Sequence, residues 1–186
     1  MIDIHSHTPK AGAVYNLTLE ELRQQPPYPD GEQWISVGLH PWDLTQAWEK
    51  DFNWVRIWAS LPQVKAIGET GFDRLHATPC QEEAFVAHAL LAEEVGKPLI
   101  IHCVKAADDL LRLHREIRPK QPWIWHGFRG NPQQVAQLVQ KGISLSFGEH
   151  FNPLSVKACP DAYLYMETDD SMADIQEIAQ RILALR

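Results

Sequence analysis

The chain has 186 residues, which suits a single domain that buries roughly 70% of the surface its unfolded form exposes. Its net charge of −7 argues against a broad basic surface for nucleic acid, so any phosphate must be captured locally. Three cysteines without Cys-x-x-Cys spacing favour idle thiols over a disulfide framework or a zinc knot. We find no signal-peptide pattern and no apolar stretch near the ~20 residues of a membrane span, and we expect a cytoplasmic protein.

The first strand-like segment ends in two histidines. An extended chain over residues 1–7 places Asp3, His5 and His7 on one face and Ile2 and Ile4 on the other. Residues 8–33 contain no β-rich run and are dense in proline, so we predict no strand there.

The rest of the chain alternates strands with helices. We predict seven strands, at residues 1–7, 34–40, 64–69, 98–104, 123–128, 143–147 and 163–168. Helices follow at 41–59, at 79–96 with Thr78 as N-cap, around 110–117, from Asn131-Pro132 to Gly142, and after Ser171 as the final cap. This alternation predicts an α/β fold with an all-parallel sheet.

Single metal-ligand-type residues end four of the later strands: Glu69, His102, His126 and Asp169. A parallel barrel gathers such strand ends at one mouth, so this pattern favours a closed or nearly closed barrel over an open sheet. Together with His5 and His7, the four residues point to a two-metal hydrolase.

Six motifs in this order closely resemble the TatD family of metal-dependent hydrolases: Asp3-x-His5-x-His7, Gly38-Leu39-His40-Pro41, Ile67-Gly68-Glu69-Thr70-Gly71-Phe72-Asp73, Ile101-His102, His126-Gly127-Phe128-x-Gly130 and Glu167-Thr168-Asp169. The resemblance implies one domain over residues 1–186, a distorted TIM-type barrel, two divalent cations and phosphodiester hydrolysis, with deoxyribonuclease activity the best-known assignment. It also implies the ligands. His5, His7, Glu69 and Asp169 match those of one cation, and Glu69, His102 and His126 match those of the second.

The chain departs from the family pattern in three places. The short connection over residues 8–33 predicts that one βα unit is missing, the segment after Asp169 is shorter than usual, and Val104 stands where the family usually has Arg. These departures affect substrate contacts more than metal ligands, so they weaken the deoxyribonuclease assignment more than the metal assignment.

Glu69 and Asp169 are the predicted catalytic residues. A carboxylate shared by two cations supplies charge that imidazoles cannot, and Glu69 is so placed, although a strand-end carboxylate can also cap a loop. Asp169 is predicted to ligate one cation and take the proton of the attacking water; the alternative is a helix N-cap. Mixed nitrogen and oxygen ligands suit Zn, Mn, Ni or Fe, with Mg binding more weakly.

Substrate contacts are predicted at His40, Asp73, Lys105 and Arg129, and Glu149 with His150 could also line the mouth. Lys105 and Arg129 follow ligand-bearing strand ends, so they are candidate phosphate clamps; otherwise they are solvated surface charges.

The resulting hypothesis is a metal-dependent phosphodiesterase or deoxyribonuclease acting on single-stranded DNA or a DNA end, with no membrane and no obligate protein partner. Two alternatives stay open: a metal-dependent amidohydrolase acting on a small molecule, and a catalytically idle metal-binding module.

Overall fold

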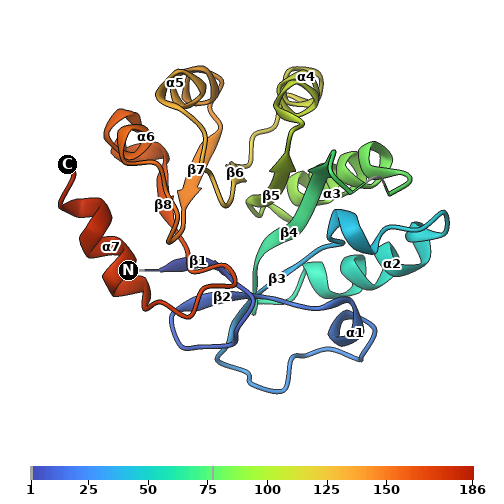
Figure 1. Ribbon diagram of the computed structural model, residues 1–186. Helices are drawn as coiled ribbons and strands as arrows, with labels where there is room; N and C mark the ends of the chain where they lie inside the picture. Colours follow the sequence, from blue (N-terminus) through green and yellow to red (C-terminus); the bar gives the residue numbers. More distant parts are fainter. Residues whose placement is uncertain (1, 77) are drawn as a thin grey trace.

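The computed structural model describes residues 2–76 and 78–186, and these form a ring of parallel strands surrounded by helices (Figure 1). The strands, each paired with the next in chain order, are β1 Asp3–Ser6, β2 Ala13–Asn16, β3 Trp34–Val37, β4 Val64–Asp73, β5 Leu99–Val104, β6 Trp123–Trp125, β7 Ser144–Phe147 and β8 Leu164–Met166. The α-helices are α1 Leu19–Leu22, α2 Trp48–Ala59, α3 Gln81–Val95, α4 Ala107–Ile117, α5 Pro132–Gln140, α6 Pro153–Ala158 and α7 Ile175–Leu183. Short 3-10 turns occur at Pro41–Asp43 and Asp161–Tyr163. The predicted parallel α/β barrel is confirmed.

The prediction of seven strands is wrong, because β2 adds an eighth strand within residues 8–33. β2 pairs in parallel with both β1 and β3, and the short helix α1 follows it under a capping box formed by Thr18 and Glu21. The βα unit is therefore shortened, not missing. Pro26, Pro27 and Pro29 lie beyond the strand, in the loop that leads to β3, where they interrupt no strand pairing.

The ring closes through backbone contacts at Asp169, just beyond the end of β8. The amide of Asp169 donates to the carbonyl of His5 (3.0 Å), and the amide of His7 donates to the carbonyl of Asp169 (2.9 Å). Below this bridge the buried carboxylate of Asp3 accepts hydrogen bonds from the amide (3.0 Å) and hydroxyl (2.6 Å) of Thr168. The barrel is thus nearly closed, and the Asp169 side chain takes no part in closing it.

A small apolar cluster fills the inside of the barrel below the mouth. It consists of Ile4, Ala66, Ile100 and Ile124, with Tyr165 packed against it. These residues come from strands that are not all neighbours, so they meet across the interior. Ile100 and Ile124 each lie two residues before a histidine, which directs His102 and His126 to the same interior side. Strict alternation fails in β1, where Ile4 also faces inward and the pairing with β2 shifts register; Met1, where the predicted strand begins, lies outside the described residues.

Two of the predicted helix caps are wrong, and one is confirmed. Helix α3 begins at Gln81 after Cys80, and the hydroxyl of Thr78 donates to the carbonyl of Pro41 (2.5 Å). Helix α7 is capped by Asp174, while Ser171 bonds to Glu149. Asn131 caps α5 in a full capping box, as predicted. None of the helices in the described part of the chain is long and apolar enough to cross a membrane.

His88 on α3 gives a prediction for stability. Its ring is fully buried against Phe52, Nε2 accepts from the amide of Leu39 (3.0 Å), and Nδ1 lies 2.7 Å from the carbonyl of Ala84. Burial lowers the pKa of His88 from 6.5 to about 4. The unfolded chain therefore takes up this proton at a higher pH than the folded chain, and the contribution of His88 to stability is lost as the pH falls from 6.5 towards 4.

We expect the difference to cost about 3 kcal/mol of unfolding free energy at pH 4 relative to pH 7. Urea unfolding with EDTA present, at several values of pH, measures it. His88→Gln should flatten the pH dependence by about this amount, whereas His150→Gln, at an exposed histidine, should leave it unchanged. Equal pH dependence in wild type and His88→Gln would contradict the assignment.

Candidate metal centre

Glu69 lies at the centre of the barrel mouth, and its two carboxylate oxygens face different groups of side chains. Oε2 lies 3.2 Å from Nε2 of His5 and 3.4 Å from Nε2 of His7. Asp169 completes this first group, with Oδ1 3.8 Å from Nε2 of His5 and 3.4 Å from Nε2 of His7. The first group therefore joins β1, β4 and the end of β8.

The other oxygen of Glu69 faces three imidazoles. Oε1 lies 2.7 Å from Nε2 of His126, 2.8 Å from Nδ1 of His102 and 3.3 Å from Nε2 of His40. His40 also lies 3.4 Å from His102 through their ring nitrogens. The other five residues predicted as ligands thus lie around Glu69, and His40, predicted as a substrate contact, lies among them.

The donor atoms of these groups fit a metal. His5, His7 and Glu69 offer atoms within 4.8 Å of one another, as do His40, Glu69 and His102, and as do His5, His126 and Asp169. Nε2 of His5 and Oε2 of Glu69 are buried and have no hydrogen-bond partner among the described residues. Buried polar atoms without partners are costly, and a bound cation would satisfy both. The mixed imidazole and carboxylate set suits a transition-metal ion.

The charges of the centre reinforce one another. Burial raises the pKa of Glu69, but the facing imidazoles of His126, His102 and His40 lower it more, and the pKa lies well below its usual value. The nearby carboxylate of Glu69, whose Oε2 lies 3.4 Å from Nε2 of His7, raises the pKa of His7. Glu69 is therefore a fixed anion between the two groups.

The backbone around Glu69 is held by a residue of the unpredicted strand β2. The buried side chain of Asn16 accepts through Oδ1 from the amide of Glu69 (2.7 Å) and from the hydroxyl of Ser36 (3.0 Å). Gly71 on β4 has φ +150°, and a Cβ there would overlap the carbonyl of His102. Glycine is therefore required for β4 and β5 to approach closely enough for Glu69 and His102 to meet.

Asp73 lies behind His102, away from solvent. Its Oδ2 accepts from the indole nitrogen of Trp42 (2.7 Å) and lies 3.4 Å from Nε2 of His102 and 3.1 Å from Nδ1 of His76. Burial raises the pKa of Asp73, but hydrogen bonds, led by that of Trp42, lower the pKa by more than burial raises it. The net pKa therefore falls far below its usual value. Its contact with the outer nitrogen of His102 leaves Nδ1 aimed at Glu69, an orientation typical of carboxylate-supported metal ligands.

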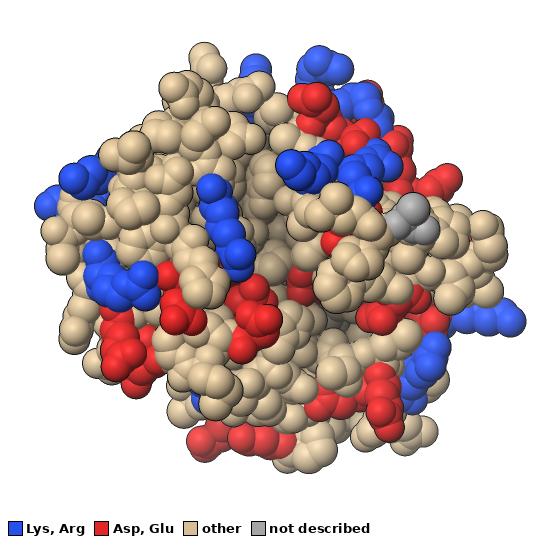
Figure 2. Space-filling model, viewed as in Figure 1, with Lys and Arg blue, Asp and Glu red and all other residues tan. Residues whose placement is uncertain are grey.

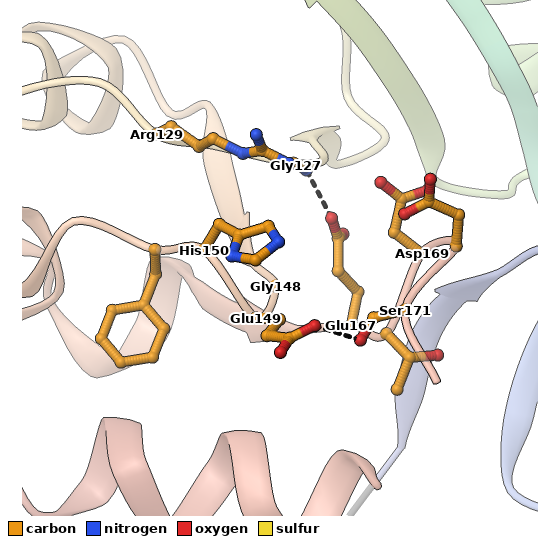
Figure 3. Close-up of a pocket in the computed structure, with 11 residues that line it drawn as sticks. Gly127, Arg129, Gly148, Glu149, His150, Glu167, Asp169 and Ser171 are labelled. Atoms are coloured by element: carbon orange, nitrogen blue, oxygen red, sulfur yellow. Dashed lines mark hydrogen bonds between the residues drawn. The ribbon is translucent and has the colours of Figure 1, made fainter. Parts of the chain in front are cut away.

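Glu167 stands behind His126 in a similar way. It is fully buried, Oε1 accepts from the amide of Gly127 (2.5 Å) and lies 3.5 Å from Nδ1 of His126. A pocket of about 250 Å³ opens beside it, bordered by Asp169, Arg129, Glu149 and His150 (Figure 3). Arg129 and His150 come from the loops after β6 and β7, so the predicted mouth-lining residues do face this region.

Two larger cavities share a wall over the centre. One, of about 460 Å³, includes His40, Asp43 and Glu69 in its lining, and the other, of about 740 Å³, includes Lys105 and Arg129. Trp42, His102, His126 and Asp169 line both. Lys105 has φ +55°, a left-handed backbone that turns the chain sharply after β5.

Sequence reasoning missed Asn16, Trp42 and Glu167 as residues of the centre. Asn16 had a detectable signal, because the run Ala13-Val14-Tyr15 before it favours a short strand. The position of Glu167 in the sequence predicts no role for it, and that of Trp42 predicts only a place at the start of a helix.

The comparisons with known proteins agree with this geometry. A family model described as TatD related DNase matches residues 14–180. The "3'-5' ssDNA/RNA exonuclease TatD" of Musicola paradisiaca is 32% identical over 151 residues, covering 75% of this chain and 57% of that protein. The "uncharacterized metal-dependent hydrolase YabD" of Bacillus subtilis is 30% identical over 150 residues, covering 73% of this chain and 58% of its own length. The chain thus spans a little over half the length of these curated relatives.

Among solved structures, the TatD homologue YjjV of Escherichia coli superposes with a TM-score of 0.68 at 20% sequence identity, covering 93% of this chain and 83% of that one. A TatD family hydrolase of Entamoeba histolytica gives a TM-score of 0.59 at 19% identity, covering 73% of this chain and 50% of that chain. These likenesses support the fold. The match of the family model over most of the chain shows that this protein belongs to the TatD family of metal-dependent hydrolases.

Proposed function

We propose that this chain is a phosphodiesterase that uses two divalent cations to hydrolyse single-stranded nucleic acid. The observation that carries the proposal is the position of Glu69, whose two oxygens face two separate groups of imidazoles. A carboxylate so placed can serve two cations at once, which is the arrangement of two-metal phosphoesterases.

The first cation would be held by His5, His7, Glu69 and Asp169, and the second by Glu69, His102 and His126. His40 lies close enough to Glu69 and His102 to complete the second set. Bound divalent cations would supply an acidified water near neutral pH and neutralise charge on the phosphoryl oxygens. Zn, Mn, Ni and Fe suit these ligands, and Mg would bind more weakly.

The side chains of the chain itself have distinct tasks in this proposal. Asp169 is one-quarter exposed at the mouth, so its carboxylate can take the proton of the attacking water. Asp73 and Glu167 orient His102 and His126 from behind. Lys105 and Arg129 line the cavity next to the centre and can pair with phosphate oxygens.

The substrate class rests on the relatives. Several carry the name 3'-5' ssDNA/RNA exonuclease, and the local position of Lys105 and Arg129 suits a single strand that enters one cleft. With a net charge of −7, affinity for a long duplex surface is not expected.

An amidohydrolase acting on a small molecule is the second candidate. Val104 stands where the family usually carries Arg, so one positively charged side chain that could bind phosphate is missing. The overall negative charge also favours an uncharged substrate.

Metal analysis of the purified protein, followed by a substrate panel with Mn, Zn and Mg, separates the candidates. We expect about two cations per chain and turnover of single-stranded oligonucleotides and bis(p-nitrophenyl) phosphate that EDTA abolishes. Turnover confined to amides or lactones would replace the proposal with the amidohydrolase. Protein that binds metal but turns over nothing on the panel would leave the catalytically idle metal-binding module.

A further inference from the structure

The two cavities over Glu69 differ in charge. In the cavity of about 460 Å³, the described lining includes Asp43 and Asp170 and no Lys or Arg. The cavity of about 740 Å³ has Lys105 and Arg129 in its wall. Figure 2 shows the same division, with basic side chains above and to the left of the central hollow and acidic side chains below it. We name these the acidic cavity and the basic cavity.

Among the described residues, no Lys or Arg in the lining of the acidic cavity offsets the charge of its aspartates. Arg23 is close enough to interact with Asp43, but its guanidinium forms two hydrogen bonds with Asp51, at 2.9 and 3.1 Å. Asp43 is exposed and accepts no side-chain hydrogen bond among the described residues. Its charge therefore acts on whatever enters the cavity.

Trp42 forms the partition between the cavities. Its side chain is 54% exposed, yet the hydrogen bond from its indole nitrogen to Asp73 (2.7 Å) fixes it in place. The rings of His40 and His76 pack against it, with centroids 4.9 and 4.4 Å away. A large, exposed and immobilised aromatic ring beside a candidate phosphate site is suited to stacking on a nucleobase.

One acidic and one basic cavity match the two parts of a nucleic acid strand that flank the phosphodiester bond nearest its end. The terminal nucleoside bears no phosphate on its outer side, whereas the remaining strand carries one phosphate per nucleotide. Both cavities have volumes typical of ligand sites. Both border His102, His126 and Asp169, so a phosphate over the centre would place one nucleoside in each.

We propose that the acidic cavity receives the terminal nucleoside, with its base stacked on Trp42, while the basic cavity receives the rest of the strand. The inference rests on the proposed function and adds to it a structural reason for removing nucleotides from an end. Because the described lining of the acidic cavity has no Lys or Arg to bind a further phosphate, the stacking on Trp42 supplies the affinity for the nucleoside, and Asp43 and Asp170 repel a strand that continues beyond it. Relatives named 3'-5' exonucleases make the 3' end the one to test.

A binding assay tests, without any hydrolysis, whether the acidic cavity discriminates against a terminal phosphate. The probe is a tetrathymidylate with phosphorothioate linkages and a 5' fluorescein, ending in either a 3' hydroxyl or a 3' phosphate, and fluorescence anisotropy in the presence of Mn gives its Kd. We expect the hydroxyl end to bind about tenfold more tightly, since a phosphate would face Asp43 and Asp170 at short range. Asp43→Asn should narrow this preference, while Asp108→Asn, an exposed aspartate outside both cavities, should not. Equal affinity of wild type for the two ends would overturn the proposal.

Stacking is tested with the same probe carrying an abasic 3' residue. Wild type should lose about tenfold in affinity when the terminal base is removed. Trp42→Ala should bind both probes equally, whereas Trp42→Phe, which keeps a ring but not the hydrogen bond to Asp73, should retain most of the difference. Trp34→Ala, at a half-exposed tryptophan that lines neither cavity, is the control. A base preference that persists in Trp42→Ala would reject the stacking role.

Hydrolysis of the unmodified oligonucleotide separates the two proposals. If the unmodified strand is bound with the expected end preference but is not cut with any metal, the proposed function fails while the arrangement of the cavities stands. If the strand is cut but shows no end preference in binding, the proposed function stands and the assignment of the two cavities fails.

Discussion

Substituting Glu69 with Gln is expected to remove both cations, not one, and hydrolysis with them. One oxygen of Glu69 faces His5 and His7, and the other faces His102 and His126, so this one side chain would supply negative charge to both cations. An amide of the same size keeps the packing but loses that charge. Metal analysis after dialysis gives the stoichiometry directly.

Thermal unfolding provides a second measurement that does not depend on turnover. A ligand present at a hundred times its Kd stabilises a protein by ~2.7 kcal/mol, which for a chain of this size corresponds to a rise in Tm of roughly 5 to 10 °C. Wild type should show such a rise with Mn or Zn, and Glu69→Gln should show almost none.

Single-group variants and a remote control make the result specific. His7 and His102 each belong to one group only, so His7→Ala and His102→Ala should each lose one cation. Glu32 is exposed, and Glu32→Gln should keep two. Two cations at full occupancy in Glu69→Gln would falsify the bridging role.

The sequence was sufficient to predict which side chains meet at the mouth, because the geometry of a parallel barrel fixes where the strand ends lie. His102 and His126 each end a strand, and parallel strands bring such ends to one side. The structure gathers them around Glu69, while their role as ligands stays a prediction. His102 and His126 also lie at matching positions of neighbouring strands, because Ile101 of β5 pairs with Trp125 of β6.

The eighth strand was missed for a physical reason. β2 has four residues, all buried, so it shows neither the alternation of a half-exposed strand nor the length of a typical one. The prolines of the following loop argue against a strand in the sequence alone, although they lie outside β2. Without β2, the sequence cannot predict the role of Asn16, whose side chain accepts a hydrogen bond from the backbone amide of Glu69.

Residues that act from behind the centre were harder to foresee. Nothing in the spacing of Asp73 or Glu167 shows that each carboxylate reaches a histidine on another strand, because that depends on how far β4 and β8 extend beyond their neighbours. Trp42 was equally hidden, since its exposure results from the loop that ends in a 3-10 turn instead of the predicted helix start.

Asp169→Asn is expected to lower kcat by roughly 10² to 10⁴-fold, the scale for loss of a positioned general base. The fold should survive, because Asp169 closes the barrel through its backbone amide and carbonyl, which Asn also provides. Its φ of +55° is one that Asn adopts readily. Steady-state kinetics on the best oligonucleotide substrate, alongside circular dichroism and metal analysis, measures these effects.

The loss should fall on kcat more than on KM, because Lys105, Arg129 and the cation at His102 and His126 would still hold the phosphate. Asp174→Asn is the matched control: Asp174 caps α7 away from the centre, and Asn caps a helix equally well. Asp169→Asn turnover close to that of wild type would mean that the carboxylate takes no proton from the attacking water. The base would then have to be another group at the mouth, and His40, 3.3 Å from Glu69 and one-fifth exposed, would be the next residue to test.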